Sequence, residues 1–263
     1  MFISFKNRKI NFSDTGSGEV VVLLHGYMET LEVWENFANR ISSKFRMLVV
    51  DFPGHGLSDL CGEINSMELM AESVKAVLDS LNIPKAFVVG HSMGGYATLA
   101  FLQLFPERLS GISLFHSHPF ADTPEAIENR YKNVTLVENG GKAEMIPGFV
   151  KNLYAEKSLK TMPASIDKSL AIASRTDAKT IIADLKGMIE RPSRVGLVEE
   201  GKIPLLWILG EKDSHINYKE TLKSIELPLN SEVAVLTDVG HMGFIEAEET
   251  SANILIEFVS KVY

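Results

Sequence analysis

Short apolar runs alternate with amphipathic stretches along most of this chain. The runs at 20–24, 47–50, 86–89, 109–115, 205–209 and 232–236 are rich in β-branched and other apolar residues. Most are continuous enough for strands that are buried on both faces of a sheet. Between several of them, apolar residues recur at helical spacing, as in 31–41 and 66–81. Alternating strands and helices predict an α/β fold with a doubly wound, mostly parallel sheet.

The two ends of the chain complete this pattern. Residues 1–12 alternate apolar and polar positions around Asn7 and Arg8, which predicts two short strands in an edge hairpin. After the run at 232–236, Ile245, Ala252, Leu255 and Phe258 mark one face of a C-terminal helix. We therefore expect the sheet to begin with an antiparallel edge and the chain to end on a helix that covers it.

The alternation stops between residues 117 and 200, where no strand-like run occurs and four helical stretches follow one another. The first begins at Thr123 and Pro124, a capping residue followed by a proline in the first turn, and ends near Gly140. We predict that residues 1–116 and 201–263 form one α/β core. Residues 117–200 are then a helical insertion between two of its strands.

Composition narrows the class of protein. The 263 residues carry a formal net charge of −8, and the basic residues are scattered singly, which argues against a nucleic-acid partner. Cys61 is the single cysteine, so no disulfide forms within the chain. No apolar run has the length of a signal peptide or a membrane span. We expect a cytoplasmic monomer or homodimer that acts on a small molecule.

Candidate chemistry is concentrated at Ser92, which lies in the sequence Gly-His-Ser-Met-Gly between a predicted strand and a predicted helix. A Gly-x-Ser-x-Gly turn in that context favours a nucleophile elbow over an ordinary glycine-rich turn between a strand and a helix. Gly90 and Gly94 allow the strand and the helix to approach closely. The backbone N–H of Met93, at the start of the helix, is unpaired and suited to an oxyanion.

Two further residues follow predicted strands at the same edge of the sheet. Asp213 comes after the strand at 205–209, and His241 after the strand at 232–236. Parallel strands end on one edge, so both side chains can meet Ser92. The order of serine, acid and histidine is that of α/β-hydrolases. We therefore expect His241 to act as the base and Asp213 to orient it.

Each of these assignments has a simpler alternative. Asp213 can cap the following helix, and His241 can be an ordinary turn residue. Asp122 is a rival acid, although it lies well inside the insertion. The remaining histidines are expected to hold loops (His25, His55), to be buried structural imidazoles (His91, His116), or to line the site without a catalytic role (His118, His215).

With these motifs in place, the chain resembles α/β-hydrolase-fold serine hydrolases over nearly its whole length, in the lidded esterase and lactonase branch. The His-Gly at 25–26 is similar to the family's oxyanion loop, which implies that Tyr27 gives the second oxyanion N–H. The segment 51–58 resembles the family's Asp-x-Pro-Gly-x-Gly-x-Ser turn, so Asp51 is expected to be structural. Serine at the elbow argues against dehalogenases and epoxide hydrolases, which use aspartate there. Ile216 and Asn217 stand where the family often has a proline.

The resemblance implies hydrolysis of a carboxylic ester, thioester or lactone through an acyl-serine intermediate, without a metal or other cofactor. The insertion is then a lid whose apolar residues line the substrate pocket, or pack the lid on the core. Candidate pocket residues are Phe120, Met145, Phe149, Tyr154 and Met188. The same three residues also support C–C bond hydrolysis or cofactor-free peroxidase activity. A third alternative is a ligand-binding module that does not turn its ligand over.

Overall fold

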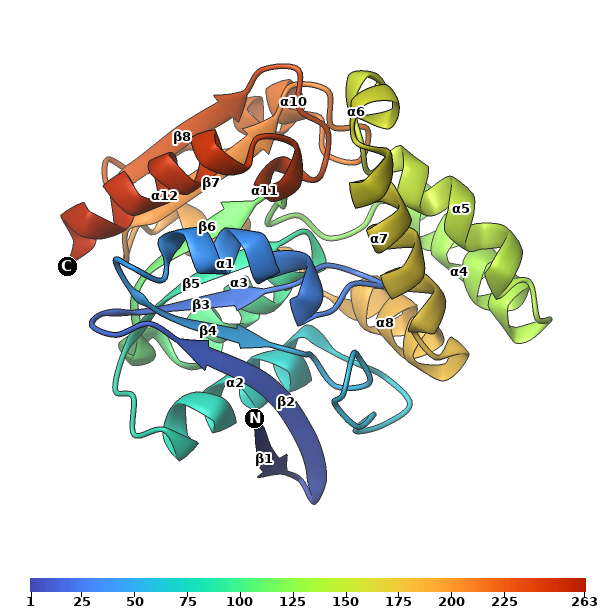
Figure 1. Cartoon of the computed structure of the whole chain (residues 1–263), viewed down its shortest axis with the longest axis horizontal. Helices are drawn as coiled ribbons and strands as arrows, with labels where there is room; N and C mark the ends of the chain where they lie inside the picture. Colours follow the sequence, from blue (N-terminus) through green and yellow to red (C-terminus); the bar gives the residue numbers. More distant parts are fainter.

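The computed structural model describes residues 1–263 and contains one eight-stranded sheet in the order β1-β2-β4-β3-β5-β6-β7-β8 (Figure 1). β1 and β2 are antiparallel to their neighbours, and all other strands are parallel. The predicted α/β fold with an antiparallel edge is therefore confirmed. The strands are β1 (Phe2–Phe5), β2 (Arg8–Thr15), β3 (Val20–Leu24), β4 (Arg46–Val50), β5 (Ala86–His91), β6 (Leu109–Phe115), β7 (Leu205–Gly210) and β8 (Ser231–Leu236).

Continuous apolar sequence accounts for the central strands. Every residue of β3, β5 and β7 is buried, as expected for strands covered on both faces. The register pairs Leu24 with Gly90 and His91 with Phe115, so β3, β5 and β6 end at the same edge of the sheet. The residues that follow these strands are therefore neighbours in space.

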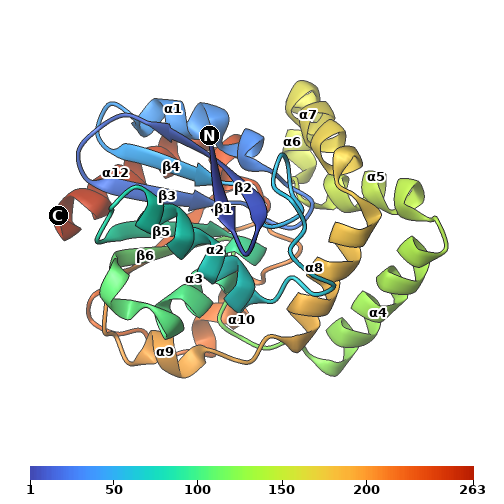
Figure 2. The same ribbon diagram turned by 90° about the horizontal axis from the view of Figure 1, so that it is seen from below.

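Helices cover the two faces of the sheet (Figure 2). The 3₁₀ helix η1 (Leu31–Trp34), α1 (Glu35–Ile41) and α12 (Glu248–Val262) lie on one face, and α2 (Met67–Ser80) and α3 (Met93–Leu104) lie on the other. The Ser66 hydroxyl accepts a hydrogen bond from the N–H of Leu69 and so caps α2. Short helices η2 (Pro106–Arg108), α10 (Tyr218–Lys223) and α11 (Gly243–Glu246) complete the core.

Six helices connect β6 to β7, and most of them lie together beyond one edge of the sheet (Figure 1). They are α4 (Pro124–Glu138), α5 (Lys142–Asn152), α6 (Glu156–Thr161), α7 (Pro163–Arg175), α8 (Ala178–Glu190) and α9 (Val195–Glu199). A buried ion pair links them to the core, with His55 Nε2 3.1 Å from Asp184 Oδ2 on α8. No helix of the protein has both the length and the apolar character needed to cross a membrane.

The helices differ from the sequence prediction in two respects, because two of them were missed and one boundary was wrong. α6 and α9 were not predicted, because helices of six and five residues are too short to establish a periodic pattern. The C-terminal helix was predicted to include Ile245, but the chain turns at Ala247, where φ is −138° and ψ is 48°. Ile245 therefore belongs to α11, and α12 begins after the turn.

Candidate active site

Ser92 lies at the sharp turn between β5 and α3, with φ of 52° and ψ of −116°. A positive φ is strained for a residue with a side chain, and such strain is typical of functional sites. The flanking glycines are required by the close contacts at this turn. A Cβ on Gly90 would lie 2.3 Å from the carbonyl oxygen of Gly94, and one on Gly94 would lie 2.5 Å from that of Leu24.

The backbone of Ser92 is tied to the end of β6. Its N–H donates to the carbonyl oxygen of Phe115 at 3.0 Å, and its own carbonyl accepts a hydrogen bond from the Ser117 hydroxyl at 2.7 Å. The indole N–H of Trp207, on β7, donates to the Ser117 carbonyl at 2.9 Å. Three neighbouring strands therefore fix the turn that carries the serine.

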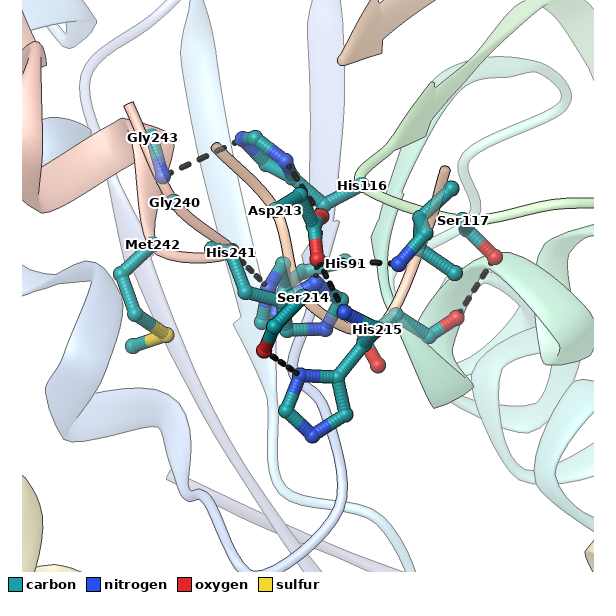
Figure 3. Close-up of polar contacts among 12 residues, drawn as sticks. His91, His116, Ser117, Asp213, Ser214, His215, Gly240, His241, Met242 and Gly243 are labelled. Atoms are coloured by element: carbon teal, nitrogen blue, oxygen red, sulfur yellow. Dashed lines mark hydrogen bonds and ion pairs between the residues drawn. The ribbon is translucent and has the colours of Figure 1, made fainter. Parts of the chain in front are cut away.

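Asp213 and His241 meet at the ends of β7 and β8 (Figure 3). His241 Nδ1 lies 2.7 Å from Asp213 Oδ2, and both side chains are almost completely buried. The other carboxylate oxygen, Oδ1, accepts hydrogen bonds from the backbone N–H groups of His215 and Ile216 at 2.8 and 3.0 Å. With its Nδ1 proton held by Asp213, His241 keeps Nε2 available to accept a proton.

A second histidine contacts the same carboxylate oxygen. His116 Nδ1 lies 3.1 Å from Asp213 Oδ2, and His116 Nε2 accepts a hydrogen bond from the N–H of Gly243 at 3.2 Å (Figure 3). Because that N–H can only donate, the proton of a neutral His116 is on Nδ1 and points to Asp213. From the sequence, His116 was expected to be a buried structural imidazole without a role in the site. Its position directly after β6, at the edge that carries Ser92, was the available signal.

These contacts set the protonation states of the pair. Burial alone raises the pKa of Asp213, but the nearby His241 and the hydrogen bonds from both histidines outweigh it and hold that pKa well below its usual range. Burial lowers the pKa of His241, and Asp213 only partly offsets this effect. At neutral pH the carboxylate is therefore ionised and His241 is a neutral imidazole that can act as a base.

Tyr27, in the loop after β3, has a free backbone N–H and lines the same cavity as Ser92. Gly26 N–H donates to Glu29 Oε2 at 2.6 Å, and His25 Nε2 accepts a hydrogen bond from the N–H of Phe52 at 3.1 Å. The N–H groups of Tyr27 and Met93 donate to no group of the chain. They are therefore available to an oxygen that develops negative charge.

A cavity of about 210 Å³ is lined by Tyr27, Ser92 and His241. Of the predicted pocket residues, Phe149 and Met188 line this cavity. Phe120 instead lines an adjoining groove of about 490 Å³ that shares His118, Asp122, Ala126, His215 and Ile216 with the cavity.

The other two predicted pocket residues line neither the cavity nor the groove. The hydroxyl of Tyr154 lies 2.7 Å from Ser169 Oγ on α7, so its ring is held between helices of the insertion. Met145 packs against the hydrophobic core. Helical periodicity identified these residues as half-buried or buried, but it does not specify which neighbour each one faces.

The alternative carboxylates have other partners. Asp122, the rival acid, pairs with Arg130 at 2.6 Å and Arg191 at 2.7 Å rather than with a histidine. Asp51 accepts hydrogen bonds from the Asn11 side chain and the Leu31 N–H, both at 2.7 Å, in agreement with a structural role. Asp213 is therefore the carboxylate that orients a histidine beside Ser92.

One group of side chains at this site has metal-ligand spacing. Ligand atoms of His116, Asp213 and His241 lie within 4.8 Å of one another. The facing nitrogen of each histidine already donates a proton to the carboxylate. A metal ion would have to displace both protons, so this set of donors fits a hydrogen-bonded acid and base better than a metal site.

The known proteins that are similar to this chain agree with the fold described above. The family model described as alpha/beta hydrolase fold matches residues 19–248. The chain is 30% identical to the dihydrolipoyllysine-residue acetyltransferase component of the acetoin cleaving system of Pseudomonas putida, over 93% of this chain and 64% of that protein. It is 29% identical to a 2-hydroxy-6-oxononadienedioate/2-hydroxy-6-oxononatrienedioate hydrolase of Paraburkholderia phymatum, over 96% of this chain and 91% of that protein.

Solved structures extend the comparison. A thermophilic esterase from Thermogutta terrifontis with malate bound superposes with a TM-score of 0.92 at 28% identity, covering 97% of this chain and 94% of that one. The enol-lactonase from Burkholderia xenovorans LB400 superposes with a TM-score of 0.89 at 18% identity, covering 99% of this chain and 100% of that one. At this lower identity the likeness indicates the fold alone.

Proposed function

The chain belongs to the alpha/beta hydrolase fold family, and we propose that within it the protein is a serine hydrolase that cleaves carboxylic esters of small, partly apolar substrates. The observation that carries this proposal is the Asp213–His241 contact of 2.7 Å at the sheet edge where Ser92 occupies a strained turn. Thioesters and lactones present the same acyl carbon and belong to the same proposed substrate class.

The proposed reaction begins when Ser92 Oγ attacks the acyl carbon. His241 Nε2 accepts the serine proton, and the ionised Asp213 stabilises the resulting imidazolium. The N–H groups of Tyr27 and Met93 bind the oxyanion, and such donors contribute about 3 kcal/mol each in serine hydrolases. His241 then returns the proton to the leaving alcohol, which departs and leaves an acyl-serine. A water molecule, deprotonated by His241, attacks this ester, and His241 returns that proton to Ser92 Oγ as the acid leaves.

We further propose that residues 117–200 act as a lid over this site. Phe149 and Met188 come from helices of the insertion and line the same cavity as Ser92. A lid excludes water, which strengthens the electrostatic interactions in the site. The cavity of about 210 Å³ is smaller than the ~300–1,000 Å³ of sites for drug-sized ligands, which supports a small substrate.

Labelling and turnover together test the assignment. A fluorophosphonate probe is expected to label the wild-type protein and not Ser92→Ala. Hydrolysis of p-nitrophenyl acetate is expected to fall by roughly 10⁴-fold or more in that variant. Retained turnover in a folded Ser92→Ala variant would overturn the proposal, and an unlabelled, inactive wild type would favour a ligand-binding module instead.

C–C bond hydrolysis is the second candidate. The observation in its favour is the hydrolase of Paraburkholderia phymatum, which is similar to this chain along 91% of its own length. The two candidates differ in the substrate and share Ser92, Asp213 and His241. A comparison of kcat/KM for p-nitrophenyl acetate and for a 2-hydroxy-6-oxo-dienoate separates them.

A further inference from the structure

One wall of the cavity that Ser92 lines is polar, and Arg130 is the arginine among its lining residues. Arg130 reaches the cavity from α4. Its Nε donates to Asp122 Oδ2 at 2.6 Å and its Nη2 to Asp122 Oδ1 at 3.3 Å. The remaining nitrogen, Nη1, donates to no group of the chain and is free for a ligand.

Arg191 does not line the cavity but contacts two residues that do, and with it positive charge exceeds negative charge at this wall. Asp122 is shared by Arg130 and Arg191, and Arg191 Nη2 donates to Asp122 Oδ1 at 2.7 Å. Two guanidinium groups therefore face one carboxylate. The Arg191 guanidinium also stacks 3.9 Å above the ring of Tyr96, another cavity residue. Glu29, the other carboxylate at the cavity, is paired with His91.

Two tyrosine hydroxyls add further donors. The hydroxyl of Tyr27 is buried and has no hydrogen-bond partner in the protein. The hydroxyl of Tyr96 lies 3.3 Å from His118 Nε2, while His118 Nδ1 accepts a hydrogen bond from the N–H of Phe120. Burial, followed by the charge of Arg191, lowers the pKa of His118 to about 3, so the ring is neutral and Nε2 carries its proton. His118 then donates to Tyr96, whose own hydroxyl proton stays available.

We propose that Arg130, Tyr27 and Tyr96 form a carboxylate-binding subsite, and that the natural substrate is a small ester bearing a carboxylate. The proposal rests on the serine hydrolase function above and specifies its substrate class. A carboxylate accepts hydrogen bonds and donates none, and this wall offers donors with a net positive charge. Phe149, Leu153 and Met188 line the rest of the cavity and suit the short apolar part of such a substrate. A monoester of succinate has this combination of groups.

The test compares monomethyl succinate with methyl succinamate, which has the same size but replaces the carboxylate by a neutral amide. The wild-type enzyme is expected to prefer the anionic ester by about 10–100-fold in kcat/KM, as charge-assisted hydrogen bonds predict. Arg130→Gln is expected to remove most of this preference, chiefly through KM, while Arg191 still pairs with Asp122. Lys132→Gln removes an exposed charge from the same helix and is expected to keep the preference.

A second variant tests the subsite even if Arg130→Gln does not fold. Tyr27→Phe removes a hydroxyl that has no partner in the protein and keeps the backbone N–H, so we expect a folded enzyme with a several-fold smaller preference for monomethyl succinate. Equal kcat/KM for the two esters in the wild type would overturn the subsite. So would a preference that both Arg130→Gln and Tyr27→Phe retain.

Binding measurements distinguish a failure of the proposed subsite from a failure of the proposed hydrolase function. Calorimetry with Ser92→Ala is expected to detect tighter binding of monomethyl succinate than of methyl succinamate, even if the wild type hydrolyses neither compound. That result with an inactive wild type would support the subsite and overturn the hydrolase. Ser92-dependent hydrolysis of p-nitrophenyl acetate without any binding preference would do the reverse.

Discussion

Glu29 and His91 form a buried ion pair behind the nucleophile, with Glu29 Oε2 3.0 Å from His91 Nδ1. Glu29 Oε2 also accepts the N–H of Gly26, and His91 Nε2 donates to the carbonyl oxygen of His241 at 2.9 Å. The pair thus connects the oxyanion loop, the strand before Ser92 and the histidine loop. Burial lowers the pKa of His91, but Glu29 and the His241 carbonyl outweigh it, so the net shift is upward.

Glu29→Gln is expected to lower both stability and activity. The substitution keeps the size of the side chain but removes the charge that His91 faces, at a cost of about 1–3 kcal/mol in the free energy of unfolding. We expect kcat to fall more than KM rises, because the loops that would move carry the oxyanion donor and the base. Urea denaturation and p-nitrophenyl acetate kinetics measure the two effects. Glu32→Gln, which alters an exposed pair with Arg175, is the matched control and is expected to change neither.

The stability cost of Glu29→Gln is expected to depend on pH. The folded-state pKa of His91 is raised above its ordinary value of about 6.5, so the pair contributes stability below that pH and loses it as the pH rises through the folded pKa. The difference between wild type and variant should therefore shrink as the pH rises above about 6.5. A difference that stays constant or grows over this range would contradict a charged His91.

The activity of the wild type is expected to fall at acidic pH. His241 must be neutral to accept the serine proton, and burial keeps its pKa below its ordinary value despite Asp213. The logarithm of kcat/KM is expected to rise with pH up to a midpoint below about 6.5 and to level off above it. A midpoint above that value, measured with a neutral ester, would contradict the protonation states described for the pair.

His116→Phe tests the second contact to Asp213. Phenylalanine is similar in size to histidine but removes one hydrogen bond to Asp213 and leaves the Gly243 N–H unpaired. We expect a loss of about 1–3 kcal/mol in stability from these two changes. Because Asp213 also loses an anchor, kcat/KM is expected to fall by roughly tenfold, the equivalent of about 1.4 kcal/mol. Thermal unfolding and ester hydrolysis provide the readouts, and full activity would show that Asp213 keeps its position without His116.

Gly94→Ala tests the close packing at the elbow. The new Cβ would lie 2.5 Å from the backbone oxygen of Leu24, which cannot move without shifting β3. We expect a loss of more than about 2 kcal/mol in stability, together with displacement of Ser92. Gly148→Ala is the control, because a Cβ there meets nothing within 4 Å and Gly148 lies inside α5. It is expected to gain about 0.5–1 kcal/mol.

The features of this molecule that could be predicted from the sequence are those that a local pattern of residues determines. Continuous apolar runs identify the parallel strands because both faces of such strands are covered. The rule that parallel strands end on one edge then predicts that Asp213 and His241 lie together. These two residues are 28 positions apart, and their contact can be predicted without knowing which way either side chain points.

Other contacts depend on pairs that no local pattern identifies. Glu29 and His91 are 62 residues apart, and His116 and Asp213 are 97 apart. The local sequence around each of these residues does not identify its partner. Only the fold brings the two members of each pair together. The polar wall of the cavity was missed for the same reason, because Arg130 looks like one charge among many on an amphipathic helix.

The long connection between β6 and β7 has a consequence for synthesis of the protein. His91 and His241 are 150 residues apart in the chain, so the serine after His91 leaves the ribosome well before its base. At about 5–20 residues per second the interval is roughly 8–30 s. During that time the nascent chain carries Ser92 without His241, the proposed base. We therefore expect hydrolytic activity to appear only when the last strand and its loop have been made.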